Sequence, residues 1–310
     1  MIVTVTANTT IDLTVFIPEL VPDTTIRATR TVQSMGGKPT DASWILGELG
    51  IPSLALGFAG GATGDKVAAL LRARGVTTDF TTADGDTRTN VIIIDEGHQT
   101  HTTITTTTMS IAPAHLAALR ERYAAALDEA SVVVLGGTLP KGVEPSFYTE
   151  FIGLARARGV PVVFDAAEPN LSAGLAAGPT YVKPNEHELA QLTNRPIDSL
   201  ADAYAAGREV IARYGVQPII TLGSAGALAV LHDRAFFAPP LKVEVVSPAG
   251  AGDAVLAGIA ASIHLGQTVE EGLRLGVAAA SAVVMMPGTA DCRRADVERF
   301  LPQVALVAYP

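Results

Sequence analysis

The stretch from Ser131 to Asp165, SVVVLGGTLPKGVEPSFYTEFIGLARARGVPVVFD, contains the alternation that decides the fold. Ser131–Leu135 and Val160–Asp165 are short β-branched or aliphatic runs, and Pro145–Arg158 between them has the length of a helix. Gly159 follows the helical segment, where a glycine supplies the left-handed cap before the chain turns back. The order strand, helix, strand predicts a parallel βαβ unit that is covered on both faces.

The same alternation extends over most of the chain. Further strands are expected at Ile2–Thr6, Ser53–Gly57, Thr180–Val182 and Pro218–Leu222. Helices are expected at Thr40–Leu49, Asp65–Arg74, Pro113–Glu129, Glu186–Leu192 and Ala201–Tyr214, and three of these also end at a glycine, namely Gly50, Gly75 and Gly215. The predicted class is therefore α/β, with a mainly parallel sheet flanked by helices.

Two stretches break this pattern, Leu13–Gln33 and Arg88–Thr108, which are rich in Thr, Val and Ile. Within the second, His101–Thr108 reads HTTITTTT and favours a strand, because β-branched residues suit a pleated surface. We expect the two insertions to build a small β-sheet lid over one end of the main sheet. The alternative is that they form edge strands of the main sheet. Residues 1–310 are then one domain that carries this lid.

Composition limits the classes of function. The 310 residues hold 22 basic and 31 acidic side chains, a net charge of −9, and no basic block, which argues against nucleic acid as a partner. A hydrophobic fraction of 48% supports a large core, and the single Cys292 excludes a disulfide framework within the chain. The first residues do not resemble a secretory signal, and the most apolar run, Leu275–Met286, is shorter than the ~20 residues that span a bilayer. We expect a cytoplasmic protein with no membrane partner.

The segment PAGAGD at residues 248–253 is the strongest chemical signal. It follows the β-like stretch Lys242–Val246 and precedes an apolar helix, Ala254–Leu265. Glycines at such a junction let backbone N–H groups point into one cavity at a helix start, where the helix dipole favours anions. Asp253 could accept a proton from an incoming hydroxyl there. The alternative is a tight turn with Asp253 as an ordinary helix cap.

Other glycine patterns narrow the choice. No stretch matches G-x-x-x-x-G-K-[ST], and the Gly250-x-Gly252 pair lacks the third glycine of a dinucleotide fingerprint. Two more glycine clusters, Gly36-Gly37 and Gly57–Asp65, each open a predicted helix. They suit close backbone approach to a polar ligand, and they also suit plain turns.

Taken in order, these motifs resemble the PfkB/ribokinase family of carbohydrate kinases. The similarity runs from Asn8 to the end of the chain and fits the branch of 1-phosphofructokinase, tagatose-6-phosphate kinase and the minor 6-phosphofructokinase. Its most specific part is PAGAGD with the helix behind it. The supporting motifs are Gly36-Gly37-Lys38, Gly60–Asp65, Thr87–Val91, Gly137–Pro140, Lys183–Glu188 and Thr221–Gly223. The resemblance implies a ribokinase-like fold and the use of ATP and Mg²⁺.

The resemblance also implies roles at the phosphates. Asp253 is the expected catalytic base, and the N–H groups of Gly250, Ala251 and Gly252 form the anion hole. The N-x-x-E element, Asn185 and Glu188, is expected to position hydrated Mg²⁺, an ion that prefers oxygen ligands; without the family, the same pair reads as a capping box. The residues expected to face ATP are Lys183, Asn185, Thr221, Gly223, Ser224 and Gly226. The apolar helix Ala278–Met286 is expected beside the adenine.

On the substrate side, the resemblance assigns Asp12 to the sugar hydroxyls and Gly36 and Gly37 to the backbone that the sugar approaches. Arg88 and Thr138 are expected to bind a phosphate that the substrate already carries, because a guanidinium can hold it in bidentate fashion.

Three departures from the family pattern affect the choice of sugar. Where relatives read G-G-K-G-x-N, this chain has Pro39 and Asp41, and Pro248 also replaces a usual residue. Asp41, expected among the substrate-binding residues, exchanges an amide donor for an anion that accepts only. Such an anion would disfavour a second negative charge on the substrate.

The expected reaction is ATP-dependent phosphoryl transfer to a hydroxymethyl group of a ketohexose phosphate such as fructose-6-phosphate, fructose-1-phosphate or tagatose-6-phosphate. One alternative is a kinase of a non-phosphorylated sugar or nucleoside, and another is a ligand-sensing relative without turnover. Dimerisation through the lid is also expected, because exposed sheet faces and strand edges are often covered by a partner.

Overall fold

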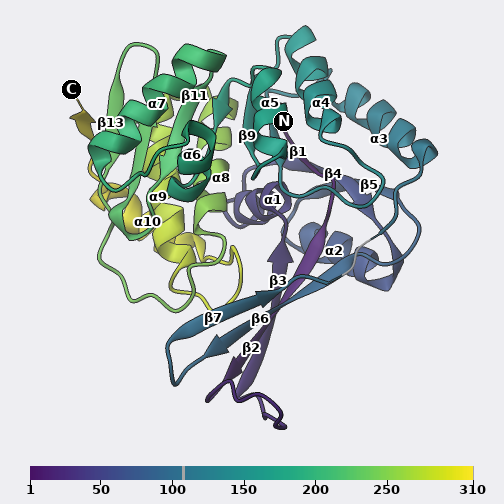
Figure 1. The fold of residues 1–310 in the computed structure, drawn as a ribbon. Coiled ribbons are helices and arrows are strands. Elements are labelled where there is room, and N and C mark those ends of the chain that lie inside the picture. Colours follow the sequence, from purple (N-terminus) through teal and green to yellow (C-terminus); the bar gives the residue numbers. More distant parts are fainter. Residues whose placement is uncertain (107–108, 310) are drawn as a thin grey trace.

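The computed structural model describes residues 1–106 and 109–309. Its main sheet has ten strands in the order β14-β13-β12-β11-β10-β9-β8-β1-β4-β5 (Figure 1). The bounds of these strands, in chain order, are β1 Ile2–Thr6, β4 Ser53–Ala59, β5 Thr77–Thr82, β8 Val132–Gly136, β9 Val162–Asp165, β10 Tyr181–Val182, β11 Gln217–Thr221, β12 Ala227–Val230, β13 Ala235–Ala238 and β14 Val307–Tyr309. The strands from β11 to β5 are parallel to one another, and β12 to β14 continue the sheet in antiparallel fashion.

Helices cover both faces of this sheet. One face is covered by α1 (Lys38–Glu48), α2 (Gly61–Ala73), α8 (Ala251–His264), α9 (Val269–Val283) and α10 (Arg294–Phe300). The other is covered by α3 (Pro113–Ala126), α4 (Ser146–Ala157), α5 (Asn170–Ala176), α6 (Glu186–Thr193) and α7 (Leu200–Tyr214). Two short 3₁₀ helices, η1 and η2, span Gly223–Ala225 and Leu301–Gln303.

Successive side chains of the buried strands point to opposite faces of the sheet, so each strand contributes to two separate cores. In β8, Val132 and Val134 face the α8 side, whereas Val133 and Leu135 face the α4 side. Strands apolar on both faces are typical of a parallel sheet between helix layers. On the α4 side, aromatic rings fill the space, with the Phe147 and Phe151 ring centroids 4.1 Å apart. The predicted α/β class with a mainly parallel sheet is confirmed.

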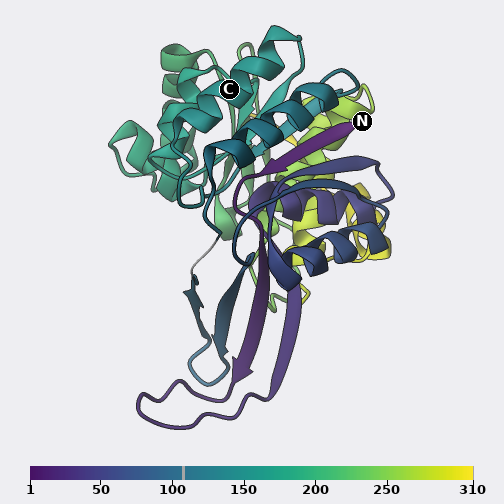
Figure 2. The same ribbon diagram turned by 90° about the vertical axis from the view of Figure 1, so that its right-hand side faces the viewer.

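A second sheet has the order β3-β2-β6-β7 and extends away from the main body (Figure 2). Its strands are β2 Thr10–Ile17, β3 Arg30–Gly36, β6 Arg88–Asp95 and β7 Thr100–Ile104. The two insertions therefore do form a small sheet, and the alternative of edge strands in the main sheet is wrong. The first insertion is longer than the predicted Leu13–Gln33. Its two strands, β2 and β3, pair along their full length, from Thr10 with Gly36 to Phe16 with Arg30. The expected strand His101–Thr108 stops at Ile104, and residues 107 and 108 lie outside the described residues.

Most other predicted elements agree with the structure to within a few residues, and the four predicted capping glycines all have positive φ angles of 69–76°. The stretch Lys242–Val246 is an exception, because it forms no strand. It follows Pro239 and Pro240, which lack the N–H donors of a sheet ladder, and Val245 is 62% exposed. The helix predicted at Ala278–Met286 is the final part of α9, which starts at Val269 and ends at Val283.

In the part of the chain that the structure describes, every helix is too short or too polar to cross a membrane.

Candidate active site

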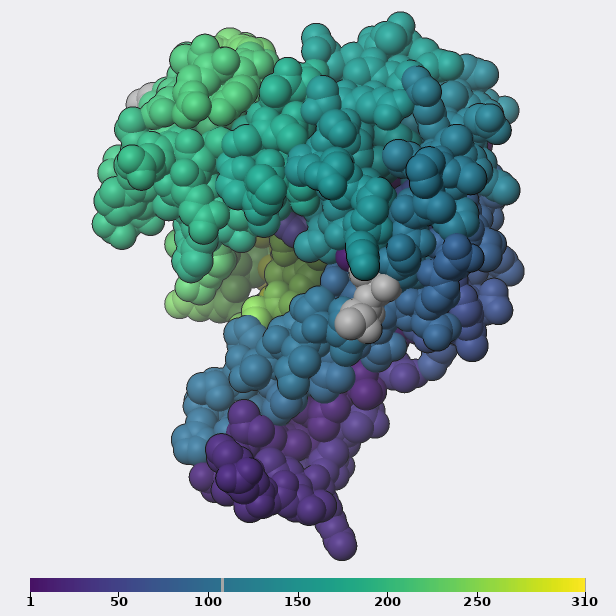
Figure 3. Space-filling view, turned by 45° about the vertical axis from the view of Figure 1, so that its right-hand side comes forward, coloured from purple at the N-terminus to yellow at the C-terminus, as the bar shows by residue number. Residues whose placement is uncertain are grey.

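The candidate residues gather where the parallel strands β1, β8, β9, β10 and β11 end. In an open α/β sheet this edge is the usual place for a ligand, because loops and helix N-termini converge there. The second sheet continues from the same edge, and Figure 3 shows a hollow between it and the main body. Chain from the carboxyl-terminal third, coloured yellow-green, is visible at the back of this hollow.

The amino terminus of α8 holds Asp253 in its first turn. The turn depends on Gly250, which caps the helix with φ +84°, and a Cβ there would lie 2.3 Å from the backbone nitrogen of Ala290. Both observations require glycine at this position. Of the predicted anion-hole amides, that of Ala251 makes a long hydrogen bond of 3.3 Å to the Pro248 carbonyl.

A chain of ion pairs lies beside Asp253. Asp165 ends β9 with 1% exposure, and Lys183 follows β10 with 4% exposure. The Lys183 ammonium lies 2.8 Å from Asp165 Oδ2, and the Lys38 ammonium lies 2.5 Å from Asp165 Oδ1 and 3.3 Å from Glu188 Oε1. Burial opposes ionisation of Asp165, but the two lysines outweigh it and lower its pKa. Burial likewise opposes the Lys38 charge, but Asp165, Glu188 and Asp253 raise its pKa.

The pKa of Asp253 is raised to about 7. Burial is the main cause and the negative charge of Asp165 adds to it, whereas Lys38, Lys183 and a hydrogen bond from Asp41 act in the opposite direction. A carboxylate that titrates near neutral pH is well matched to taking a proton from an alcohol, since the ideal catalytic pKa lies near the operating pH. Lys183 also approaches the helix start, because a Cβ on Gly252 would lie 3.2 Å from its ammonium nitrogen.

Asp41 lies against Asp253 from the first turn of α1, which begins after Gly37. Its side chain is hydrogen-bonded to that of Asp253, and the residue is 2% exposed. Burial, followed by the charges of Asp253 and Asp12, raises the pKa of Asp41 well above its usual range. Three carboxyl groups from α1, α8 and β2 are thus close enough to influence one another.

Asp12, on β2, has two hydrogen-bond donors. Asn90 Nδ2 donates to its Oδ1 at 3.0 Å, and the Thr289 hydroxyl donates to its Oδ2 at 2.9 Å. Burial raises the pKa of Asp12, while these two bonds and the nearby Arg88 charge oppose the rise. Gly36 leaves the space for this carboxylate, because a Cβ there would lie 2.5 Å from Asp12 Oδ1.

Arg88, at the start of β6 in the second sheet, and Thr138, in the loop after β8 of the main sheet, also meet. A terminal nitrogen of the half-buried Arg88 donates to Thr138 Oγ1 at 3.2 Å, and Asn8 Nδ2 donates to the same oxygen at 3.2 Å. Within residues 1–106 and 109–309, no carboxylate forms an ion pair with Arg88, and its buried Nε has no hydrogen-bond partner. A guanidinium that has no close ion pair and keeps an unused donor is suited to an anionic ligand.

On the predicted nucleotide side, Asn185 and Glu188 form a reciprocal capping box at the start of α6. Glu188 N–H donates to Asn185 Oδ1 at 2.8 Å, and Asn185 N–H donates to Glu188 Oε2 at 3.0 Å. Thr221 at the end of β11 lies beside Asn185, with its N–H bonded to the Pro184 carbonyl at 3.1 Å. The capping interpretation is confirmed, and it leaves the metal-binding role a prediction.

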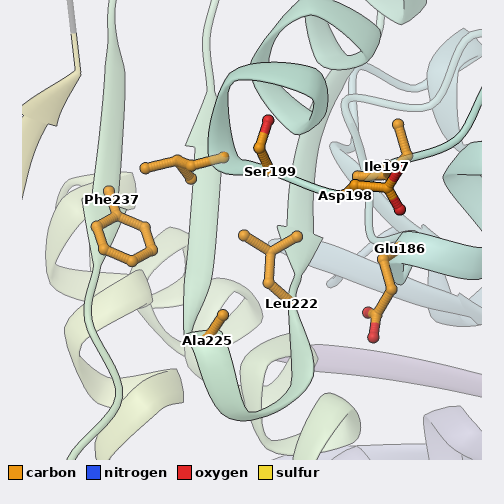
Figure 4. Close-up of a pocket in the computed structure, with 8 residues that line it drawn as sticks. Glu186, Ile197, Asp198, Ser199, Leu222, Ala225 and Phe237 are labelled. Carbon is orange, nitrogen blue, oxygen red and sulfur yellow. The ribbon is translucent and has the colours of Figure 1, made fainter.

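The remaining predicted nucleotide residues lie in the turn between β11 and β12. Gly223 and Ser224 belong to η1 and are exposed, and Gly226 backs onto the Ala238 carbonyl, which a Cβ would approach to 2.3 Å. Beside this turn lies a pocket of about 260 Å³ (Figure 4). Its lining residues are Glu186, Ile197, Asp198, Ser199, Leu200, Leu222, Ala225 and Phe237. With two carboxylates and no cation among these described residues, the pocket does not suit phosphates.

Among the described residues, no three His, Cys, Asp or Glu side chains form a group that could hold a metal ion. Mg²⁺ that keeps most of its water needs only one or two protein oxygens, so the oxygens of Asn185 and Glu188 are sufficient for such an ion. The residues present therefore fit a hydrated magnesium and do not fit a dedicated protein cage.

Several residues at this site were absent from the predicted set, among them Asp165, Lys38 and Thr289. Asp165 had a signal, because it ends a buried strand at the ligand-binding edge, and Lys38 stands in the Gly36-Gly37-Lys38 motif, although the resemblance assigns no role to the lysine. Thr289 had none, since it lies in a loop after α9 and reaches Asp12 only through the tertiary fold.

Comparison with known proteins identifies the class. The profile of the pfkB family carbohydrate kinases matches residues 2–296, and the chain belongs to this family. The family, and with it an ATP-dependent sugar kinase, is therefore as the sequence predicts.

Two related sequences from this family carry the names of different sugar-phosphate kinases. A 1-phosphofructokinase of Xanthomonas campestris is 35% identical over 266 residues, which cover 84% of this chain and 83% of that protein. A tagatose-6-phosphate kinase of Staphylococcus epidermidis is 31% identical over 278 residues, covering 88% and 89%.

Solved structures agree with the fold. Phosphofructokinase-2 from Escherichia coli in complex with substrates and products superposes with a TM-score of 0.89 at 28% identity, covering 98% of this chain and 99% of that one. Arabidopsis thaliana ribokinase superposes with a TM-score of 0.78 at 24% identity over 97% of this chain and 98% of that one, which shows the fold alone. The predicted ribokinase-like fold is confirmed.

Proposed function

We propose that this protein transfers a phosphoryl group from ATP to a hydroxymethyl group of a ketohexose phosphate. The observation that carries the proposal is the placement of Asp253, with its pKa of about 7, at the start of α8 and beside Lys183. The names of the relatives, 1-phosphofructokinase and tagatose-6-phosphate kinase, support a ketohexose phosphate as the acceptor.

In the proposed reaction, Asp253 takes the proton of the attacking hydroxyl. The substrate oxygen forms a bond to the γ-phosphorus, and the bond from that phosphorus to the leaving oxygen of ADP breaks. The N–H groups of Gly250, Ala251 and Gly252 stabilise the charge that develops on the transferring group, aided by the positive end of the helix. Lys183 supplies a full positive charge at the same place.

The acceptor would be held by Asp12 and by the backbone of Gly36 and Gly37, with Arg88 and Thr138 binding its phosphate. Arg88 supports this assignment because no carboxylate forms a close ion pair with it within the described residues. A bidentate guanidinium–phosphate contact of this kind is a charge-assisted hydrogen bond, which is about twice as strong as a neutral one.

For the nucleotide, the proposed contacts are Lys183, Asn185, Thr221, Gly223, Ser224 and Gly226. Asn185 and Glu188 would hold hydrated Mg²⁺, which when bound neutralises phosphate charge. Their reciprocal capping bonds fix both side chains, so the oxygens are positioned before a ligand arrives.

We also propose that residues 1–310 work as one kinase domain, in which the second sheet closes over the substrate and excludes water. The exposed apolar side chains of that sheet and its loop, Leu20, Val21 and Ile104, support a homodimer formed through it.

The decisive test is a screen of sugars and sugar phosphates with coupled detection of ADP. We expect turnover with a ketohexose phosphate, and we expect Asp253→Asn to abolish it. Turnover restricted to neutral sugars or nucleosides would replace the proposal with the alternative kinase. Binding without turnover for every acceptor would favour the ligand-sensing alternative.

A further inference from the structure

The Asp41 and Asp253 carboxyl groups are hydrogen-bonded to each other across the contact between α1 and α8. An ionised carboxylate can only accept hydrogen bonds, so this bond requires that one of the two groups carries a proton. Asp41 is 2% exposed, and its Oδ1 has no hydrogen-bond partner among the described residues.

The surrounding charges decide which of the two holds the proton. Asp41 faces Asp253 from α8 and Asp12 from β2, and both are acids. Asp253 instead faces the cations Lys38 and Lys183, as well as Asp165. The positive charges stabilise an ionised Asp253, whereas both charged groups that act on Asp41 within the described part of the chain are acids. The proton therefore belongs on Asp41.

We propose that Asp41 is a protonated positioning residue that donates a hydrogen bond to the Asp253 carboxylate and so holds the catalytic base in its ionised, accepting form. This inference rests on the proposed function, in which Asp253 takes the substrate proton. Asp41 thereby does the work of an amide donor, the group that related sequences place at this position of the motif.

A neutral Asp41 removes a difficulty that the sequence raises. An anionic Asp41 would repel the phosphate of a ketohexose phosphate, but a protonated one adds no charge to the site. The buried position supports this state, because burial disfavours the charged form of a carboxyl group and raises the pKa of Asp41.

The arrangement makes catalysis sensitive to alkaline pH. When Asp41 loses its proton, two carboxylates face each other, and the hydrogen bond turns into a repulsion. The other charged groups around the pair are Asp12, with Arg88 beside it, and Asp165, with Lys38 and Lys183. The two protons belong to the pair as a whole, so activity should peak between two apparent pKa values.

The test compares kcat/KM against pH for the wild type, Asp41→Asn and Asp41→Ala. Asn keeps a donor that does not titrate, so Asp41→Asn should keep more activity near neutral pH than Asp41→Ala and should lose the alkaline decline. Asp41→Ala should fall about 10- to 100-fold, the cost of removing a partner from a buried charged group. An alkaline decline in Asp41→Asn equal to that of the wild type, or equal losses in the Asn and Ala variants, would overturn the proposal.

A second measurement does not depend on turnover. The infrared spectrum of the wild type at pH 8.5, above the pKa of about 7 of Asp253, should contain the band of a protonated carboxyl group, which is absent from Asp41→Asn and disappears from the wild type at still higher pH. Absence of this band in the folded wild type would overturn the proposal even if Asp41→Asn does not fold. If the band is present but no sugar phosphate is turned over, the proposed function fails while the protonation of Asp41 stands.

Discussion

The Thr289 hydroxyl donates a hydrogen bond of 2.9 Å to Asp12 Oδ2, and the Thr289 N–H donates one of 2.8 Å to Ser34 Oγ. The loop after α9 is thereby bonded to β2 and β3 of the second sheet. The next residue, Ala290, donates its N–H to the Ala249 carbonyl at 3.1 Å, immediately before α8. Two consecutive residues therefore connect the proposed sugar side of the site with the proposed phosphate side.

The first prediction concerns this connection. Thr289→Val keeps the shape of the side chain but removes the donor from a buried carboxylate. A hydrogen bond to a charged group contributes about 1.5–3 kcal/mol, so KM for the sugar phosphate should rise about 10- to 100-fold, with a smaller change in kcat. Steady-state kinetics with the acceptor found in the screen measures this effect.

Thr289→Ser is the matched control, because it keeps the hydroxyl and should keep a KM close to that of the wild type. If the Ser and Val variants change KM equally, the effect comes from packing, and the hydrogen bond to Asp12 is not what holds the substrate.

The second prediction separates phosphorylated from neutral acceptors. Arg88→Ala removes the guanidinium that donates to Thr138 and has no carboxylate partner within the described residues. KM for the sugar phosphate should rise about 10- to 100-fold, since charge-assisted bonds are lost, while KM for the corresponding unphosphorylated sugar should not change.

Arg88→Lys should recover only part of the loss, because a lysine cannot form the bidentate contact. An unchanged KM for the sugar phosphate in Arg88→Ala would argue against a phosphate site at this position.

How much of this could be read from the sequence depends on the range of the interactions. Local signals sufficed for the buried strands, since runs such as VVVL in β8 and the glycine after α4 determine their own structure. The pattern failed at Lys242–Val246, where strand propensity competes with two preceding prolines. The small sheet was predictable in kind, but its register was not, because it depends on the pairing of β2 with β3 across a long loop and with β6, which lies far along the chain.

The residues of the candidate site also divide into those that a local motif identifies and those that only long-range contacts bring together. Asp253 and Gly250 stand in one short motif, so the sequence identifies them. The ion pairs of Asp165 with Lys38 and Lys183 join residues 127 and 18 positions apart, and no local pattern announces them. The protonation of Asp41 is likewise a property of the folded site, because the acids that face it come from β2 and α8.

The third prediction tests the turn before α8. Gly250→Ala forces an alanine into a positive φ and brings its Cβ within 2.3 Å of the Ala290 nitrogen. Backbone strain of this kind costs about 1–3 kcal/mol, and the turn must shift away from Ala290. We expect a lower melting temperature and a loss of kcat greater than 10-fold, measured by thermal unfolding and by ADP formation.

Gly153→Ala is the control within the same protein. Gly153 lies inside α4, no atom would contact its Cβ within 4 Å, and its φ is not positive. Alanine there should leave activity unchanged and stabilise the fold by about 0.4–1 kcal/mol. Equal effects of the two substitutions would show that the Gly250 turn has no special role.

The fourth prediction links the catalytic base to stability. The pKa of Asp253 is raised to about 7, so the folded chain holds this proton more tightly than the unfolded chain does. The stability that the Asp253 carboxyl contributes is fully present at pH values below the ordinary pKa of Asp, and it is lost as the pH rises through 7. Asp253→Asn, which is neutral at every pH, should therefore melt at a higher temperature than the wild type at pH 8.5, and the difference should shrink toward pH 5.5.

The same variant, Asp253→Asn, should lose about 10²- to 10⁴-fold in kcat, the usual contribution of a general base.

Asp202→Asn is the control, because the pKa of Asp202 is shifted in the opposite direction to that of Asp253. The Ser199 hydroxyl lowers the pKa of Asp202, so its contribution to stability is present above the ordinary Asp range and is lost only in acid. Thermal unfolding at both pH values should show Asp202→Asn slightly less stable than the wild type throughout. An Asp253→Asn variant whose melting temperature differs from the wild type equally at pH 5.5 and 8.5 would show that the Asp253 pKa is not raised by burial in the folded protein.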